Sequence, residues 1–170
     1  MVNIWNRISD ALVTKSLTLG KGAKVYAPNR AGTLVPVGLG ATETLTAATT
    51  LTADDNGKTL FLSATTEFAT TLPAPAAGLK FTFVVSAAPS GASYTVVTSG
   101  SSNIIKGMVL SADLNAANDG DIETSGGDTI TFADGVAVAG DRVDLICDGT
   151  NWFAYGACTV YNAITITTAS

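Results

Sequence analysis

The stretch that decides the fold is Gly140-Asp141-Arg142-Val143-Asp144-Leu145-Ile146-Cys147-Asp148-Gly149-Thr150-Asn151-Trp152-Phe153-Ala154-Tyr155-Gly156. Its middle, residues 148–151, predicts a tight turn, because glycine readily adopts positive φ and Asp and Asn side chains bond to nearby backbone. Apolar residues flank this turn on both sides, which indicates a β-hairpin. In that register Cys147 faces Trp152 and Ile146 faces Phe153, so both faces of the hairpin are apolar. We expect a second sheet to cover one face, and another subunit is a candidate for the other.

The composition of the 170-residue chain favours strands and turns over helices. Hydrophobic residues make up 46% and charged residues only 14%, with Thr, Ala, Gly and Val abundant and Lys and Glu scarce. A chain of this length can bury about 70% of its unfolded surface, which is enough for one domain plus an appendage. The sequence therefore predicts an all-β protein. We expect an antiparallel β-sandwich or jelly-roll-like body at residues 41–170, preceded by an extended N-terminal arm at residues 1–40.

Short apolar or alternating runs, separated by Gly, Pro, Asn and Asp, predict the strands of the body. Besides the hairpin, strands are expected at residues 58–63, 67–72, 79–87, 93–98, 103–106, 109–110, 129–132 and 160–167. Residues 38–50 are interpreted as a linker or the approach to the body, and residues 115–128 as an acidic loop. No short repeat indicates a solenoid.

The charge is divided unequally between the arm and the body. Residues 1–40 carry five basic residues against Asp10, a net charge of +4, whereas residues 41–170 carry four basic against thirteen acidic residues, a net charge of −9. A basic segment on an acidic body predicts that the arm binds another surface, with an acidic protein as the candidate partner. The basic residues expected to carry this contact are Arg7, Lys15, Lys21, Lys24 and Arg30. The simpler alternative is an arm that folds back on its own acidic body.

The beginning of the arm has a helical pattern. Ile4, Trp5, Ile8 and Leu12 fall close to one helical face, so residues 3–13 are a candidate for a short amphipathic helix. Trp5 is the obvious anchor if this segment docks on a partner, because aromatic residues often dominate interfaces. Capping of the protein's own core is an equally good explanation of Trp5. Short strands are also expected in the arm, at residues 16–19, 24–27 and 33–37, and such strands can add to a sheet edge on another molecule.

Several function classes lack the residues that they need. The chain has no histidine, which removes the usual general base and the commonest metal ligand and excludes a Ser-His-Asp or Cys-His site within the chain. There is no phosphate-binding loop and no dinucleotide fingerprint. The acidic residues lie mostly in expected turns, where solvation is the simplest explanation. We therefore expect no enzymatic activity. Nucleic acid is not an expected partner, since five dispersed charges without interleaved aromatic residues make a poor phosphate track.

One acidic segment has a composition that suits calcium. Oxygen ligands at short spacing, with a glycine for the turn, are what Ca²⁺ requires. The spacing does not match an EF-hand loop and no helices flank it, so a solvated loop is the simpler interpretation and no cofactor is expected. The candidate ligands are Asp113, Asn115, Asp119, Asp121 and Glu123.

The aromatic residues near the hairpin suggest a second, weaker binding hypothesis. Trp152, Phe153, Tyr155 and Tyr161 could form a stacking platform for a glycan. A tryptophan in this position belongs more often to the core, so the glycan remains the less favoured interpretation.

The cysteines and the N-terminus indicate a protein that is made in a reducing cytoplasm. The hairpin register pairs Cys147 with Trp152 and leaves Cys158 several residues beyond, so two small buried thiols are expected and not a disulfide. The first residues lack the basic region and apolar run of a signal peptide. No stretch approaches the ~20 continuous apolar residues of a membrane span, and no membrane partner is expected.

Three segments resemble a known class of proteins. The pattern Gly-Asp-x-Val-x-Leu, followed by Asp-Gly-Thr-Asn-Trp and an aromatic residue, resembles the closing hairpin of β-rich virion proteins of tailed bacteriophages. Residues 51–62, with the sequence LTADDNGKTLFL, and residues 68–83 are similar to earlier strands of the same modules. The likeness extends over residues 45–157. It implies a module used in capsid decoration proteins, head fibres and tail fibres, without separating these uses.

The resemblance, the charge division and the size together predict a capsid decoration (cement) protein. It would bind the outer head surface of the virion and stabilise the shell by bridging capsomers, with the major capsid protein as partner. A homotrimer is expected, because head lattices offer threefold and quasi-threefold sites and modules of this kind usually trimerise. The alternative is a tail-fibre or head-fibre module that binds the bacterial surface. A third hypothesis is a β-domain whose arm mediates oligomerisation only.

Overall fold

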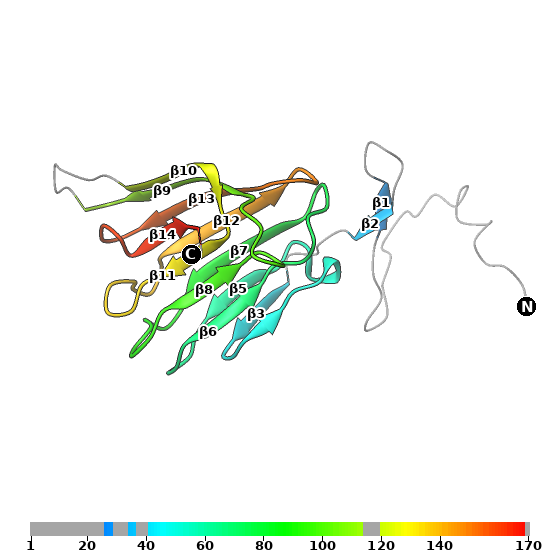
Figure 1. Cartoon of the computed structure of the whole chain (residues 1–170). Helices are drawn as coiled ribbons and strands as arrows, with labels where there is room; N and C mark the ends of the chain where they lie inside the picture. Colours follow the sequence, from blue (N-terminus) through cyan, green and yellow to red (C-terminus); the bar gives the residue numbers. More distant parts are fainter. Residues whose placement is uncertain (1–25, 29–33, 37–40, 114–119, 169–170) are drawn as a thin grey trace, which may run out of the picture.

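We describe a computed structural model of the chain over residues 26–28, 34–36, 41–113 and 120–168 (Figure 1). Within the arm, β1 (Tyr26–Pro28) and β2 (Leu34–Pro36) form an antiparallel pair, close to two of the strands expected there. The expected helix at residues 3–13, the strand at 16–19 and the basic residues of the arm lie outside the described residues.

The body is a two-layered β-sandwich, which confirms the expected fold class (Figure 1). One layer has seven strands in the order β10 (Gly120–Gly127), β9 (Ile105–Ser111), β13 (Trp152–Cys158), β12 (Arg142–Cys147), β7 (Lys80–Val85), β5 (Thr59–Leu62) and β3 (Thr42–Leu45). The other has five, in the order β14 (Ile164–Thr167), β11 (Thr129–Phe132), β8 (Tyr94–Val97), β6 (Phe68–Thr71) and β4 (Thr49–Thr50). A short 3-10 turn, η2 (Ala53–Asp55), precedes β5.

The chain winds between the two layers from β3 to β8. Consecutive strands in this part lie in opposite sheets, so each strand pairs in parallel with the strand two places before it in the sequence. In one layer β5 pairs with β3 and with β7, and in the other β6 pairs with β4 and with β8. The β13–β9 pair is also parallel. Both sheets are therefore mixed and not antiparallel throughout, because most connections cross from one sheet to the other instead of turning back in a hairpin.

Three expected boundaries were wrong. Residues 38–50 are not only a linker, because they contain β3 and β4. The expected acidic loop at 115–128 contains β10, which pairs antiparallel with β9. The two short strands expected at 103–106 and 109–110 are one strand, β9, since the parallel partner β13 pairs with it along its whole length.

The closing hairpin has the predicted register. Cys147 pairs with Trp152 and Ile146 with Phe153 across β12 and β13. Asp148 holds the turn, because its Oδ1 accepts hydrogen bonds from the backbone N–H groups of Thr150 and Asn151, each at 2.7 Å. These two bonds hold the pKa of Asp148 below its ordinary value. The hydrogen bonding of an Asp side chain to nearby backbone, which the sequence predicted for this turn, is therefore confirmed.

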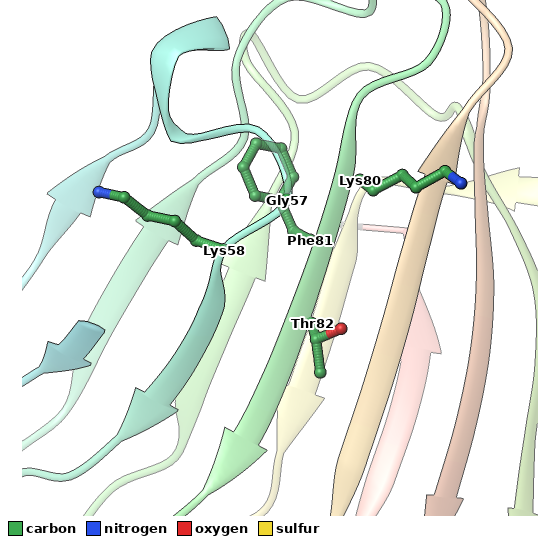
Figure 2. A pocket seen from close by; sticks show the side chains of 5 residues that line it. All are labelled: Gly57, Lys58, Lys80, Phe81 and Thr82. Carbon is green, nitrogen blue, oxygen red and sulfur yellow. The ribbon is translucent and has the colours of Figure 1, made fainter. Parts of the chain in front are cut away.

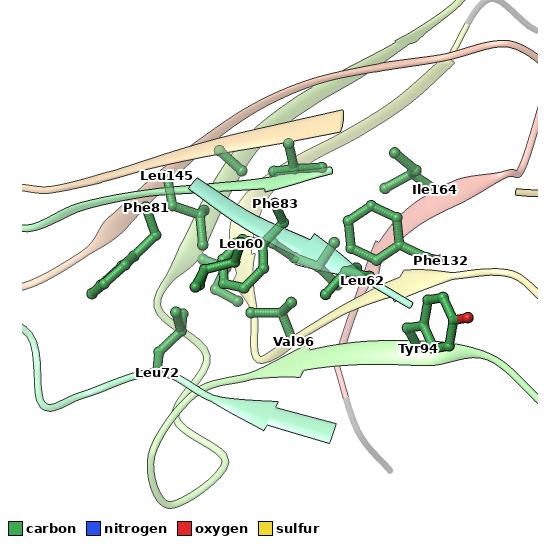
Figure 3. Packing of buried hydrophobic residues seen from close by; sticks show 14 of the residues in the cluster. Leu60, Leu62, Leu72, Phe81, Phe83, Tyr94, Val96, Phe132, Leu145 and Ile164 are labelled. Atoms are coloured by element: carbon green, nitrogen blue, oxygen red, sulfur yellow. The ribbon is translucent and has the colours of Figure 1, made fainter. Parts of the chain in front are cut away.

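The core lies between the two sheets and is made by alternate residues of their strands (Figure 3). The largest fully buried side chain is that of Trp152, whose ring centroid lies 5.7 Å from that of Phe81. Phe68 and Tyr94 pack in the same way from the five-stranded sheet, at 4.8 Å. Such tilted aromatic pairs add to the free energy of area burial. Also fully buried are Leu60, Leu62, Leu72, Phe83, Ile105, Ile130, Phe132, Leu145 and Ile164.

One side of the sandwich is closed where the chain passes from β10 in the large sheet to β11 in the small one. Gly126 has a φ of +118°, and a Cβ there would lie 2.3 Å from the carbonyl oxygen of Asn103. A Cβ on Gly127 would lie 2.8 Å from the carbonyl oxygen of Thr167. Only glycine fits a backbone that approaches two neighbours this closely. Asp128, buried at the crossing, then donates its N–H to the Thr167 carbonyl oxygen.

Tyr94 ties two loops to the core. Its hydroxyl accepts a hydrogen bond from the Ala64 N–H at 3.0 Å, and it lies 2.7 Å from the Ala64 carbonyl oxygen and 3.1 Å from that of Ala87. Ala64 lies in the β5–β6 connection and Ala87 in the β7–β8 connection, so one buried hydroxyl contacts the backbone of two sheet-crossing connections.

Tyr94→Phe is expected to lower the free energy of unfolding by about 1–3 kcal/mol, because it leaves partly buried backbone groups of Ala64 and Ala87 without this partner. Tyr155→Phe is the matched control, since the Tyr155 side chain is exposed and should change stability by less than about 0.5 kcal/mol. Urea unfolding of both variants measures the difference. Equal stabilities for the two variants would contradict this role of Tyr94.

Candidate interaction surface

Alternate residues of four neighbouring strands place apolar side chains on the outer surface of the seven-stranded sheet. The register runs from Asp144 in β12 to Tyr155 in β13, Met108 in β9 and Ile122 in β10. The adjacent row joins Ile146 to Phe153, and on the other side Leu110 lies opposite Ala157. We call the exposed set Met108, Leu110, Ile122, Ile146, Phe153 and Tyr155 the outer apolar face.

The outer apolar face is exposed to an unusual degree for such side chains. Ile122 is 71% exposed, Tyr155 56%, and the other members between 41% and 49%. Single exposed hydrophobic residues are common, but contiguous apolar patches on a monomer usually mark an interaction site. Sequence reasoning expected an apolar second face on the hairpin and missed Met108, Leu110 and Ile122. The signal for Met108 and Leu110 was their spacing by two residues within β9, which carries weight only beside β13. Ile122 had no such signal, because it lies in the segment that was expected to be an acidic loop.

A polar cluster borders this face. Asp144 Oδ1 accepts a hydrogen bond from the Thr82 hydroxyl at 2.6 Å and one from Arg142 Nη2 at 2.8 Å. The ion pair with Asp144 raises the pKa of Arg142, chiefly through that hydrogen bond. A cavity of about 280 Å³ lies here, lined by Arg142, Asp144, Tyr155 and Ala157. An aromatic ring beside a fixed ion pair can bind either a protein side chain or a sugar ring.

The outer surface of the five-stranded sheet has a different chemistry. Its register rows run Thr71–Val97–Thr129–Thr167 and Ala69–Thr95–Thr131–Thr165 across four strands. Six of these eight positions are threonine, so this surface presents hydroxyl groups that water can solvate. The two outer faces of the sandwich therefore differ, and the apolar one is the candidate for a protein contact.

A charged cluster connects the edge strand β3 to the start of β5. It lies near Ala41, where the described residues of the body begin. Lys58 Nζ lies 2.6 Å from Glu43 Oε2 and 2.7 Å from Asp55 Oδ1. Asp55 Oδ2 accepts hydrogen bonds from the N–H and hydroxyl of Thr52, at 2.8 and 3.0 Å. Partial burial opposes ionisation of Asp55, but the bonds from Lys58 and Thr52 outweigh it and lower its pKa, while the same ion pairs raise the pKa of Lys58.

A second cavity, of about 190 Å³, lies next to this cluster and is lined by Gly57, Lys58, Lys80, Phe81 and Thr82. Figure 2 shows the two lysine side chains extending away from each other on either side of it. Lys58 is already paired with two carboxylates. The two ammonium groups therefore do not converge on one point, and this cavity is not an anion site.

The hairpin register separates two of the candidate calcium ligands. Glu123 pairs with Gly107 and Asp113 follows the end of β9, so the two are about 20 Å apart along the strand direction at the usual rise. Glu123 Oε1 also accepts hydrogen bonds from the N–H groups of Ser125 and Gly126. Asn115 and Asp119, and the side chain of Asp121, lie outside what the structure describes. No group of three or more potential metal ligands occurs among the residues that are described.

The two cysteines and the aromatic residues near the hairpin differ in whether their side chains are buried or exposed. Cys147 and Cys158 are buried free thiols, as expected, and burial raises the pKa of both. Trp152 belongs to the core, so it cannot serve a stacking platform. Phe153 and Tyr155 remain available on the outer apolar face, and Tyr161 is half-buried in the turn between β13 and β14.

Comparison of the chain with protein-family models, with curated proteins and with solved structures finds no match. Among the described residues, no helix is long and apolar enough to cross a membrane.

Asp55→Asn is expected to lower the free energy of unfolding by about 1 kcal/mol at neutral pH, because it removes one of the two charged partners of Lys58 in a partly exposed cluster. The folded-state pKa of Asp55 is lowered, so its contribution is present above the ordinary carboxyl pKa and is lost as the pH falls through the folded-state value. The wild-type and variant proteins should therefore converge at acid pH. Denaturant titrations over a pH series measure this, with Glu67→Gln on an exposed loop as control.

Proposed function

We propose that this protein is a capsid decoration (cement) protein of a tailed bacteriophage, located on the outer surface of the virion head. The observation that carries the proposal is the charge division: a basic segment of net charge +4 precedes an acidic sandwich of net charge −9. The resemblance of the β12–β13 hairpin and of residues 51–83 to virion modules supports the same class. The proposed role is structural and not enzymatic, and requires no cofactor.

The mechanism is bridging of neighbouring capsomers. The arm binds acidic surfaces of the major capsid protein, with Trp5 as an apolar anchor and with Arg7, Lys15, Lys21, Lys24 and Arg30 supplying charge. Because the protein binds only the assembled shell, it shifts the equilibrium toward that shell by mass action. Three copies assemble as a homotrimer on the threefold or quasi-threefold sites of the head. Nucleic acid and membranes are not partners in this proposal.

The second candidate is a head-fibre or tail-fibre module that binds a glycan on the bacterial surface. One observation favours it: Tyr155 is exposed at the cavity formed with Arg142 and Asp144, and Phe153 lies two residues away on the same face. Stacking of a sugar on an aromatic ring with a neighbouring carboxylate is a common mode of glycan recognition. This candidate predicts specific adsorption to bacterial cells.

Replacement of Arg7, Lys15, Lys21, Lys24 and Arg30 by Gln in the full chain is expected to abolish saturable binding to undecorated expanded heads. Each basic group near an acidic surface contributes electrostatic attraction that salt screens, so binding of the wild-type protein should also weaken as salt increases. Co-sedimentation of the purified proteins with heads over a salt series measures both effects.

Exchange of Lys for Arg and of Arg for Lys at the same five positions keeps the charge of the arm and is the matched control, and this variant should still bind heads. Full occupancy of heads by the arm variant would contradict the assignment of the arm. Absence of binding by the wild-type protein to heads, together with adsorption to cells, would instead support the fibre module.

A further inference from the structure

The outer apolar face also differs from the rest of the body in charge. Three of the four basic residues of the body, Lys80, Lys106 and Arg142, lie on strands β7, β9 and β12 and point to this side of the sheet. Asp144 is the one acidic residue in β7, β9, β12 and β13, and it is paired with Arg142. β10 also carries Asp121 and Glu123, which alternate along the strand with Ile122. The surface is therefore apolar and carries a small positive charge.

The remainder of the body is strongly acidic. Without the three basic residues and Asp144, residues 41–170 carry Lys58 against twelve acidic residues, of which Asp128 and Asp141 are buried and do not contribute to the surface. The arm has the same sign of charge as the outer apolar face and is a poor occupant for it. A cationic apolar face is complemented by an acidic protein surface, and the body of a second copy of this chain presents exposed carboxylates such as those of Glu67, Asp134 and Asp148.

We propose that copies of this protein associate through the outer apolar face, which packs against the acidic body surface of the next copy. The two contacting surfaces are different, so the contact is heterologous, and a heterologous contact closes into a ring when its rotation permits. Only the number of copies in the ring, three, rests on the proposed function. The contact itself follows from the exposure and charge of the described residues.

Substitution in the full chain separates this contact from other uses of the face. Phe153→Thr with Tyr155→Thr removes the two exposed rings, while threonine keeps the strand propensity of both positions. The control is Val138→Thr with Val160→Thr, two valines, each 38% exposed, that lie in loops outside the strands of the outer apolar face. Melting curves of both variants establish that they are folded.

Sedimentation velocity over a concentration series measures the association of each variant. The wild-type protein and the valine control should sediment as trimers, at three times the chain mass of 17.2 kDa, and the ring variant should require about a hundredfold higher concentration to associate. Lys106→Glu should also weaken association, whereas Lys21→Glu in the arm, with the same change in net charge, should not.

Two outcomes would overturn the inference. A wild-type protein that stays monomeric at all concentrations would show that a different partner covers the face, and loss of head or glycan binding by the ring variant would then identify it. A ring variant that associates like the wild-type protein would place the contact elsewhere. No capsid enters the sedimentation experiment, so its failure is distinct from failure of the proposed function, which co-sedimentation with heads decides.

Discussion

The register of the β12–β13 hairpin is the constraint on which the rest of the structure depends. β12 pairs with β7, and β13 pairs with β9, so this hairpin joins the parallel strands β3, β5 and β7 to the β9–β10 pair in one sheet. The register sends Trp152 into the core and Phe153 and Tyr155 outward. A slip of one residue would exchange these faces, because side chains alternate along a strand. The register of this hairpin therefore fixes both which side chains enter the core and which lie on the exposed surface.

The sandwich has two outer surfaces that are suited to different environments. The threonine rows of the five-stranded sheet can be solvated through their hydroxyl groups, whereas the outer apolar face leaves six large side chains partly in water. Fully covering side chains of this size is favourable by about 1.5–3 kcal/mol each relative to leaving them exposed. This difference makes the two outer surfaces chemically distinct, which is compatible with the proposed bridging role.

The proposed roles assign separate tasks to the arm and the body. The arm supplies positive charge to an acidic capsid surface, and the outer apolar face holds copies of the body together. Association of the bodies would present several arms at once, and linking several weak contacts raises the overall affinity through effective concentration without any new contact. The high net negative charge of the bodies would oppose random aggregation away from the shell.

Local chemistry explains what was predicted correctly. The hairpin, its turn, the strands β5, β6, β7, β8 and β11, and the two free thiols follow from turn residues and from alternation over short segments. β3 and β4 were missed because their Ala- and Thr-rich sequence has no apolar alternation; in β3 only Leu45 is buried, and pairing with β5 forms the strand. β10 was missed because acidic residues and glycines predict a loop, and only β9 gives it a partner.

The sequence alone determined that the chain is all-β, that its hairpin has two apolar faces and that its charge is divided between the arm and the body. Only the tertiary structure decided that the strands from β3 to β8 alternate between two sheets, and that Met108, Leu110 and Ile122 join Phe153 and Tyr155 on one exposed surface. The physical reason is that turns and alternation are set by neighbours along the chain. Strand pairing between distant segments is set by burial of the whole core, which no short window of sequence contains.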